Sequence, residues 1–319
     1  MFTNLRNRTL IAALLTLAIA RAAAAQADVG TRASGMAGAF VAVADDATAV
    51  YWNPAGVGTG SIVSVVLDAG RFRLGSVPSQ GVPNEEDTGA IVALSATAFG
   101  LAYYRLGTYG ISTAESAGMS PRSREEVLRS VHALTLSTVG VSLVQSLGEH
   151  IVVGATPKLV HGDGELTGDV DAGVMAWANR FRFGLVARNL TTPAFAEATA
   201  GKPGEGEEIE LQREVRIGGA WGSGWTGISR VVVSVDGDVM SRATPAGDRR
   251  DVAAGLETWW MNQRIGVRGG VRRSTIGEAR AAVAAGISAG VKPGMLVEAH
   301  ILRGRDDERS WSVGARMTF

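Results

Sequence analysis

From Ser61 onward, apolar and polar residues alternate in short runs that are separated by turn residues. Such regular spacing predicts an all-β sandwich or barrel and disfavours alternating strands and helices. The last run is the clearest: one face holds Trp311, Val313, Ala315, Met317 and Phe319, and the other holds Ser310, Ser312, Gly314, Arg316 and Thr318.

The length of these runs favours a membrane barrel over a soluble sandwich. About fourteen runs can be counted, at residues 61–74, 88–97, 98–107, 130–147, 149–161, 169–178, 181–190, 211–221, 228–239, 249–260, 263–273, 279–290, 294–304 and 309–319. Most come close to the ~9–11 residues of a tilted transmembrane strand and exceed the ~5–6 typical of globular sheets. An even strand number is also typical of outer-membrane barrels.

Short turns alternate with longer, charged loops along this part of the chain. The short connections are 147–149, 178–180, 222–227, 261–263 and 290–293, and the longer ones are 75–87, 107–129, 162–168, 191–210 and 240–250. Outer-membrane barrels divide their two rims in this way. We therefore predict an antiparallel transmembrane β-barrel of about fourteen strands over residues 61–319. Its first strand must pair with its last, because a free strand edge is not tolerated in lipid.

The stretch from Thr31 to Gly56 does not alternate. Asp45 and Asp46 precede an alanine-rich apolar run, which is a helix N-cap signal. Pro54 predicts the end of that helix, because a proline biases the residue before it away from the helical region. We interpret residues 28–60 as a compact hatch, or plug, inside the lumen of the barrel.

Residues 1–27 have the pattern of a secretory signal peptide. Arg6 and Arg8 form a basic region, residues 9–20 are apolar, and Ala25-Gln26-Ala27 fits a cleavage site. A membrane anchor is the alternative, but the apolar run is well short of the ~20 residues that a spanning helix needs. We expect export, cleavage and location in the outer membrane.

Composition and motif searches exclude several classes of function. The chain has 31 basic and 31 acidic residues, and this balance argues against a nucleic-acid partner. It has no cysteine, which excludes disulfides and thiolate metal sites. Its four histidines lack metal-binding spacing, so we predict no metal, no cofactor and no enzymatic activity. A chance Ser–His pair, such as Ser137 or Ser142 with His132, remains open.

Two stretches resemble a known family. Residues 32–46, RASGMAGAFVAVADD, followed by residues 51–56, YWNPAG, resemble the N-terminal signature of FadL-like outer-membrane proteins. The match is nearest to the branch of PorV-type and outer-membrane TraF-like barrels, and residues 183–190, FGLVARNL, are similar to a strand of that branch. The resemblance implies a 14-stranded barrel closed by an N-terminal hatch. In FadL-like proteins, hydrophobic molecules enter the barrel and leave sideways through a gap in its wall.

The candidate site residues form two groups. The hatch or gating group is Arg32, Gly35, Gly38, Asp45, Asp46, Asn53, Pro54, Ala55 and Gly56. The group expected to face the lumen is Lys158, Arg182, Arg188, Arg216, Asp236, Glu257, Arg268, Arg272, Glu298 and Arg316. We expect the polar hatch residues to bond to inward-facing charges such as Arg188, Arg268, Arg272 and Arg316. The alternative is purely structural: Asp45 caps a helix, Asn53 stabilises a turn, and Gly35 and Gly38 allow unusual backbone angles.

The functional expectation is uptake of hydrophobic compounds across the outer membrane, gated by the hatch. The alternative is a PorV-like interaction barrel that serves protein secretion and transports no small molecule. The expected partners are outer-membrane lipid, a hydrophobic ligand or a secreted protein, and the barrel assembly machinery. Phe319 closes the final alternating strand and resembles the signal that this machinery recognises.

Overall fold

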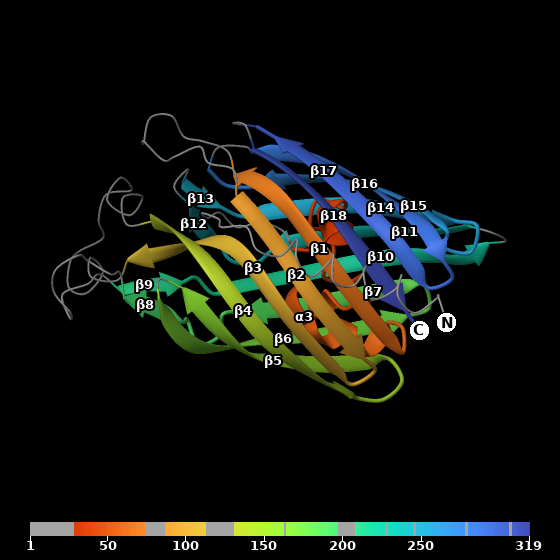
Figure 1. Ribbon diagram of the computed structural model, residues 1–319, viewed down its shortest axis with the longest axis horizontal. Helices are drawn as coiled ribbons and strands as arrows, with labels where there is room; N and C mark the ends of the chain where they lie inside the picture. Colours follow the sequence, from red (N-terminus) through yellow and green to blue (C-terminus); the bar gives the residue numbers. More distant parts are fainter. Residues whose placement is uncertain are drawn as a thin grey trace, which may run out of the picture.

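A computed structural model describes residues 29–74, 87–112, 131–162, 164–196, 208–226, 229–244, 247–277, 280–305 and 308–319. Within them the chain folds into a closed antiparallel barrel (Figure 1). The main sheet has sixteen strands, and all but two, β8 and β9, form the barrel, which leaves fourteen. These are β1 (Val63–Leu74), β2 (Asp87–Ala96), β3 (Phe99–Ser112), β4 (Val131–Ser146), β5 (Ile151–Gly162), β6 (Glu165–Ala178), β7 (Phe181–Arg188), β10 (Glu214–Thr226), β11 (Ser229–Asp238), β14 (Asp251–Trp260), β15 (Ile265–Ser274), β16 (Ala281–Lys292), β17 (Met295–Gly304) and β18 (Glu308–Thr318).

Pairing of the first strand with the last closes the barrel. Strand β1 runs antiparallel to β18 over its whole length, with Val65 opposite Met317 and Arg71 opposite Trp311. Val63 and Phe319 exchange two backbone hydrogen bonds of 3.0 and 3.3 Å at the end of this ladder. The predicted fourteen-strand barrel is therefore confirmed, and the described strand bounds lie close to the predicted ones.

Each barrel strand has one exposed face and one buried face. On β18, Trp311 and Val313 are exposed, whereas Ser312 and Arg316 are buried. The polar positions of the alternation thus point to the buried face and most apolar positions to the exposed one. This reverses the arrangement of a soluble protein and is the arrangement expected of a barrel in lipid.

Four short strands lie in the loops that the sequence predicted to be long. Strand β8 (Ala194–Ala196) pairs with β9 (Glu208–Leu211), and β9 pairs with the far end of β3. Strands β12 (Arg242–Thr244) and β13 (Gly247–Arg249) form a separate hairpin. All four lie at the end of the barrel opposite the C-terminus (Figure 1). Runs of three or four residues are too short to show alternation, so the sequence did not reveal them.

Residues 29–60, which we call the N-terminal segment, form three short helical turns. They are α2 (Thr31–Ser34), α3 (Ala49–Trp52) and the 3-10 helix η1 (Pro54–Thr59). The segment contacts β16, β17 and β18 through α2, and β3 to β6 through α3 and η1. The two ends of the segment therefore contact strands that lie far apart in the sheet order.

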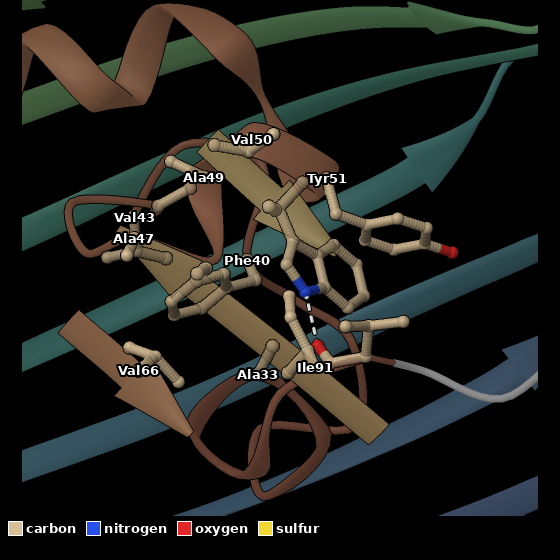
Figure 2. Close-up of a cluster of buried hydrophobic side chains, with 14 of the residues drawn as sticks. Ala33, Phe40, Val43, Ala47, Ala49, Val50, Tyr51, Val66 and Ile91 are labelled. Atoms are coloured by element: carbon tan, nitrogen blue, oxygen red, sulfur yellow. Dashed lines mark hydrogen bonds between the residues drawn. The ribbon is translucent and has the colours of Figure 1, made fainter. Parts of the chain in front are cut away.

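Aromatic packing forms the core of the N-terminal segment (Figure 2). Trp52 is 1% exposed, and its ring meets Phe40 and Tyr51 edge-on at centroid distances of 5.9 and 5.5 Å. Its indole N–H donates to the Val29 carbonyl at 2.7 Å, the dashed line in Figure 2. Ile91 of β2 and Val66 of β1 belong to the same cluster, so the core joins the segment to the wall.

Glycines on the buried face let the wall approach the backbone of the segment. An added Cβ at Gly270 would lie 2.3 Å from the Met36 carbonyl, and one at Gly184 would lie 2.5 Å from the Val41 carbonyl oxygen. One at Gly154 would lie 2.5 Å from the Pro54 carbonyl carbon. Since real Cβ contacts are not this short, only glycine fits at these positions. Some of the 42 glycines of the chain therefore serve the fit between segment and wall.

Some predictions concern residues outside the described ranges. The predicted signal peptide, residues 1–27, lies there, as do most of the predicted loops 75–87 and 107–129. Within the described part of the chain, no helix combines the length and the apolar character needed to span a membrane.

The ladder between β4 and β5 lacks two residue pairs, although its register is the same on both sides and the hydroxyls of Ser142 and Thr156 lie 2.7 Å apart across it. Gly140 pairs with Lys158 and Leu143 pairs with Ala155, but the positions between these pairs are unpaired in this ladder. Pro157 lies at one of the missing pairs and has no N–H to donate, so it removes a ladder hydrogen bond from the middle of a strand. This is a local weak point of the wall.

Replacing this proline is expected to strengthen the wall. Pro157→Val supplies an N–H that can reach the facing strand, and one such bond contributes about 1 kcal/mol to the free energy of unfolding. Urea unfolding in lipid vesicles measures the change. Ala155→Val, on the same exposed face where pairing is regular, is the matched control. An equal gain in both variants would show that the added side chain, not the hydrogen bond, is responsible.

Candidate functional site

The centre of the candidate site is Arg32, on the one-turn helix α2. Arg32 is 5% exposed, and its Nε and Nη2 donate to the two carboxylate oxygens of Glu257 on β14 at 2.8 and 2.7 Å. Its Nη1 donates to Asp45 at 2.5 Å and to Asp46 at 3.1 Å. A planar guanidinium presents its donors in a fork that suits this two-point contact with a carboxylate. Arg32 thus ties the N-terminal segment both to itself and to the wall.

The ion pairs continue along the wall. Arg268 on β15 and Arg316 on β18 each place an Nη2 3.1 Å from Glu298 Oε1 on β17. Arg268 Nε also lies 3.6 Å from Glu257, and Arg316 Nη1 lies 3.6 Å from Asp46. The contact between Arg316 and Asp46 is therefore a second ion pair that joins the wall to the segment.

Charges within this network are balanced. Arg182 on β7 completes it by placing Nη1 3.2 Å from Asp45 Oδ2. Its members are four arginines and four acids: Arg32, Arg182, Arg268, Arg316, Asp45, Asp46, Glu257 and Glu298. Buried charges are costly unless they are paired, and here each has an opposite charge beside it.

Backbone groups of the segment are anchored as well. The Asp236 carboxylate on β11 accepts hydrogen bonds from the backbone N–H groups of Phe40 and Val41 at 2.6 and 2.7 Å. Its neighbour Ser234 donates to the Ala39 carbonyl at 2.7 Å. These bonds satisfy a part of the segment that has no regular secondary structure.

The two short helices after residue 45 are organised by their polar residues. Asp46 Oδ1 accepts from the Thr48 N–H at 3.0 Å, just before α3 begins. Asn53 is extended, as the following proline requires, and its Oδ1 accepts from the Ala55 N–H at 3.2 Å at the start of η1. Asn53 Nδ2 also donates to the Val174 carbonyl of β6 at 3.2 Å. Asn53 thus caps η1, whereas α3 has no side-chain cap: Asp46 accepts from Thr48 before the helix begins, and Asp45, the predicted cap, forms ion pairs instead.

The remaining members of the hatch group fit tightly where they lie. An added Cβ at Gly56 would lie 2.0 Å from the Ala44 carbonyl oxygen, and one at Gly35 would lie 2.8 Å from Arg268 Cδ. Gly38 has φ 80, a backbone angle that disfavours other residues. Pro54 occupies the first position of η1, and Ala55 is fully buried.

Three predicted lumen-facing residues make other contacts. The guanidinium carbon of Arg188 lies over the Tyr51 ring, 4.4 Å from its centroid. Its Nη1 lies 3.5 Å from Glu214 Oε2. Arg272, which we expected to hold the hatch, donates instead to Glu308 at 2.5 Å, because it lies near the far end of β15. Arg216 lies 3.4 Å from Asp238.

Lys158 forms a separate cluster on the buried face of β5. It lies 3.0 Å from Asp169 and 2.7 Å from Asp171 of β6, and 3.0 Å from Asn189 Oδ1. All the predicted lumen-facing residues therefore lie on the buried face of the strands or at its edge, but only some of them touch the segment.

Sequence reasoning missed two anchors of the segment. Asp68 on β1 accepts from the backbone N–H of Thr31 at 2.5 Å and also contacts the Thr31 hydroxyl. Ser234 was not singled out either. Both occupy buried-face positions of strands that were correctly identified, so the alternation itself was the signal that could have found them.

Little free space remains beside the segment. One cavity lined by Tyr51, Tyr104, Lys158 and Arg188 has a volume of about 40 Å³. That volume admits a few waters, whereas ligand pockets usually measure roughly 300–1,000 Å³. Within the described residues, no group of three or more histidine or acidic side chains is arranged to hold a metal ion.

Breaking the central pair from one side is expected to loosen the segment. Arg32→Met leaves the buried Glu257 carboxylate without its two-point partner, a kind of change that costs about 3–5 kcal/mol. Hydrogen–deuterium exchange of the amides in residues 29–60 should rise strongly. The double variant Arg32→Met/Glu257→Gln should recover much of the protection, because no unpaired charge remains. Equal exchange in the single and double variants would contradict this account.

The pH dependence of the segment should reflect Asp45. Burial alone would raise the pKa of Asp45, but Arg32 and Arg182 outweigh burial and lower the pKa from 3.8 to about 2. A lowered pKa means that ionised Asp45 stabilises the folded state above pH 3.8 and that this contribution is lost as pH falls towards 2. The stability difference between the wild type and Asp45→Asn should therefore be constant at neutral pH and shrink below pH 3.8. A difference that persists unchanged at pH 2 would refute the assignment.

Comparison with solved structures gives the same barrel. The chain superposes on the CymD monoaromatic hydrocarbon channel with a TM-score of 0.62 at 12% identity, covering 91% of this chain and 97% of that one. It superposes on the Ralstonia pickettii toluene transporter TbuX with a TM-score of 0.57 at 11% identity, covering 91% and 98%. For a Pseudomonas aeruginosa FadL homologue the TM-score is 0.55 at 11% identity, covering 93% and 98%.

Sequence comparison is less extensive. Residues 163–238 match the protein family described as "F plasmid transfer operon, TraF, protein". No curated protein sequence matches the chain. The structural likeness therefore establishes a shared fold, and at that level it confirms the predicted resemblance to FadL-like barrels.

Proposed function

We propose that the chain is an outer-membrane barrel through which hydrophobic compounds cross the membrane, and that the N-terminal segment is a hatch inside its lumen. Two of the similar structures are described as a hydrocarbon channel and a toluene transporter, which supports this class of cargo. The exposed apolar face of the strands and the pattern of residues 1–27 support location in the outer membrane.

The observation that carries the proposal is what lies beside the missing ladder hydrogen bond at Pro157. Next to this place, in the direction of the short turns, the exposed side has a recess lined by Leu143, Ala155 and Val174 among others. On the buried side, Thr156 Oγ1 donates to the Val50 carbonyl of the segment at 3.4 Å. A hydrophobic compound that left sideways between β4 and β5 would pass from the lumen into lipid here, once the segment had moved.

Movement of the segment is required, because the space beside it is too small for a ligand in the present arrangement. The polar anchors suit such a hatch, since water can replace ion pairs and hydrogen bonds when the segment shifts. We assign the gating role to four residues that each bond to a residue of the wall: Arg32, Asp45, Asp46 and Asn53. Gly35, Gly38, Pro54, Ala55 and Gly56 shape the segment so that it fits.

A second candidate is an interaction barrel that serves protein export without transporting small molecules. The extensive ion network favours this candidate, because many ion pairs would hold the N-terminal segment in place. A barrel that transports nothing does not need that segment to move. Residues 163–238 match a family that is described by a plasmid transfer operon and not by transport of a small molecule. In either case the C-terminal strand ending at Phe319 remains the predicted contact with the assembly machinery.

A reversible covalent lock on the hatch tests the first candidate. Met36 Cβ lies 3.0 Å from the position of an added Cβ on Gly255, so a small adjustment would admit a disulfide, which needs roughly 3.5–4.5 Å. Since the chain has no cysteine, Met36→Cys/Gly255→Cys introduces the only thiols. The toluene entry that the oxidised variant adds to that of empty vesicles should vanish and should return after reduction, because only the released hatch can move.

The control lock joins two wall positions. In Arg264→Cys/Gly290→Cys, the corresponding separation is 3.5 Å and the hatch is not involved, so toluene entry should be unaffected by oxidation. Entry that continues through the locked hatch would refute gating. If the wild-type protein gave no entry above empty vesicles, the transport proposal would fail and the export candidate would stand.

A further inference from the structure

Four arginines gather on the exposed side of the barrel. Arg71 and Arg73 lie on β1, Arg303 on β17 and Arg309 on β18, and three of them are exposed while Arg73 is half-buried. Arg73 stands directly opposite Arg309 in one ladder, and Arg309 stands directly opposite Arg303 in the next. We call these four residues the arginine row. Its strands are neighbours at one side of the barrel (Figure 1).

Such a row is unfavourable by itself. Residues directly opposite in an antiparallel pair have Cβ atoms about 4.5–5.5 Å apart, and like charges at this distance repel. Here the unfavourable pair occurs twice in succession across three strands. An anion with more than one negative charge, placed against the row, would offset the repulsion.

Neighbouring residues place the row at the border of the apolar band. Trp311, which is 48% exposed, lies opposite Arg71, and Val313 and Ile301 follow on the same exposed face. From these residues towards the short turns the exposed face of β17 and β18 is apolar. Tryptophan is enriched where apolar chains meet the lipid headgroups. The arginine row therefore stands at headgroup level, on the rim that carries the long loops.

The described carboxylate nearest to the row in sequence faces the other side of the wall. Glu308, next to Arg309 in sequence, is 4% exposed and bonds to Arg272 on the buried face. Arg71, Arg73 and Arg309 have other interactions within the chain. These do not preclude a ligand, because a guanidinium has five N–H donors and a single carboxylate uses at most two of them.

We propose that the arginine row binds the phosphate groups of an anionic lipid in the leaflet at the long-loop rim. Arginine suits this role because its fork of donors matches phosphate oxygens, and basic residues near a membrane surface attract anionic lipid. A lipid bearing two phosphates would bridge the opposed arginines. The inference rests on the proposed membrane location but not on transport of any compound.

Native mass spectrometry of the detergent-solubilised protein can test this inference. The probe is diphosphorylated lipid A, a glycolipid with two phosphates, compared with zwitterionic phosphatidylcholine. We expect retention of lipid A in preference to phosphatidylcholine, and loss of affinity by about five-fold for each arginine removed in Arg303→Gln/Arg309→Gln. Arg303→Lys/Arg309→Lys keeps the charges and should keep most of the binding. Arg180→Gln/Arg264→Gln, at exposed positions of the opposite rim, is the matched control and should bind as the wild type does.

Each other outcome overturns the proposal. Unchanged binding in Arg303→Gln/Arg309→Gln would show that the row is not the site. An equal loss in Arg180→Gln/Arg264→Gln would show general attraction of anions without a site. If inorganic pyrophosphate displaced lipid A as effectively as lipid A itself does, the row would be a site for free phosphate and not for a lipid. A failure of toluene entry would leave these results unaffected.

Discussion

The two-point bond between Arg32 and Glu257 is the contact on which the candidate site depends. Both groups are buried, and an isolated buried charge is strongly unfavourable, so neither can be placed there without the other. The pair also fixes the position of α2 against β14, and from it the bonds to Asp45, Asp46 and Arg268 follow. A single ion pair thus sets the position of a segment that has little regular secondary structure of its own.

Most of the barrel could be predicted from sequence because the membrane imposes a strict rule on each strand. Apolar residues must face lipid while the other face is buried, and this keeps a period of two over strands such as β5 and β18. The short strands β8 and β9 escaped notice because they lie beyond the barrel, where no such rule applies. Phe195 of β8 is fully buried against Leu136, Val160 and Leu211, a contact that depends on how the loop folds back.

The site could be predicted as a set of residues but not as a set of bonds. Alternation places Asp236, Glu257 and Arg268 on one face, whereas the choice of partner depends on strand register and barrel curvature. These made Arg182 the second partner of Asp45 and turned Arg272 towards Glu308. The missing hydrogen bond at Pro157 and the contact of its neighbour Thr156 with Val50 became apparent only in three dimensions.

The balance of charges in the ion network determines the distance over which the wall attracts the N-terminal segment. The N-terminal segment contributes one positive and two negative charges, and its wall partners contribute three positive and two negative ones. Displacing the segment therefore separates one net charge from an equal and opposite one. At physiological ionic strength such attraction fades within about 8 Å once water enters. The wall accordingly attracts the segment strongly at contact distance and only weakly beyond it. This attraction should weaken as the salt concentration rises.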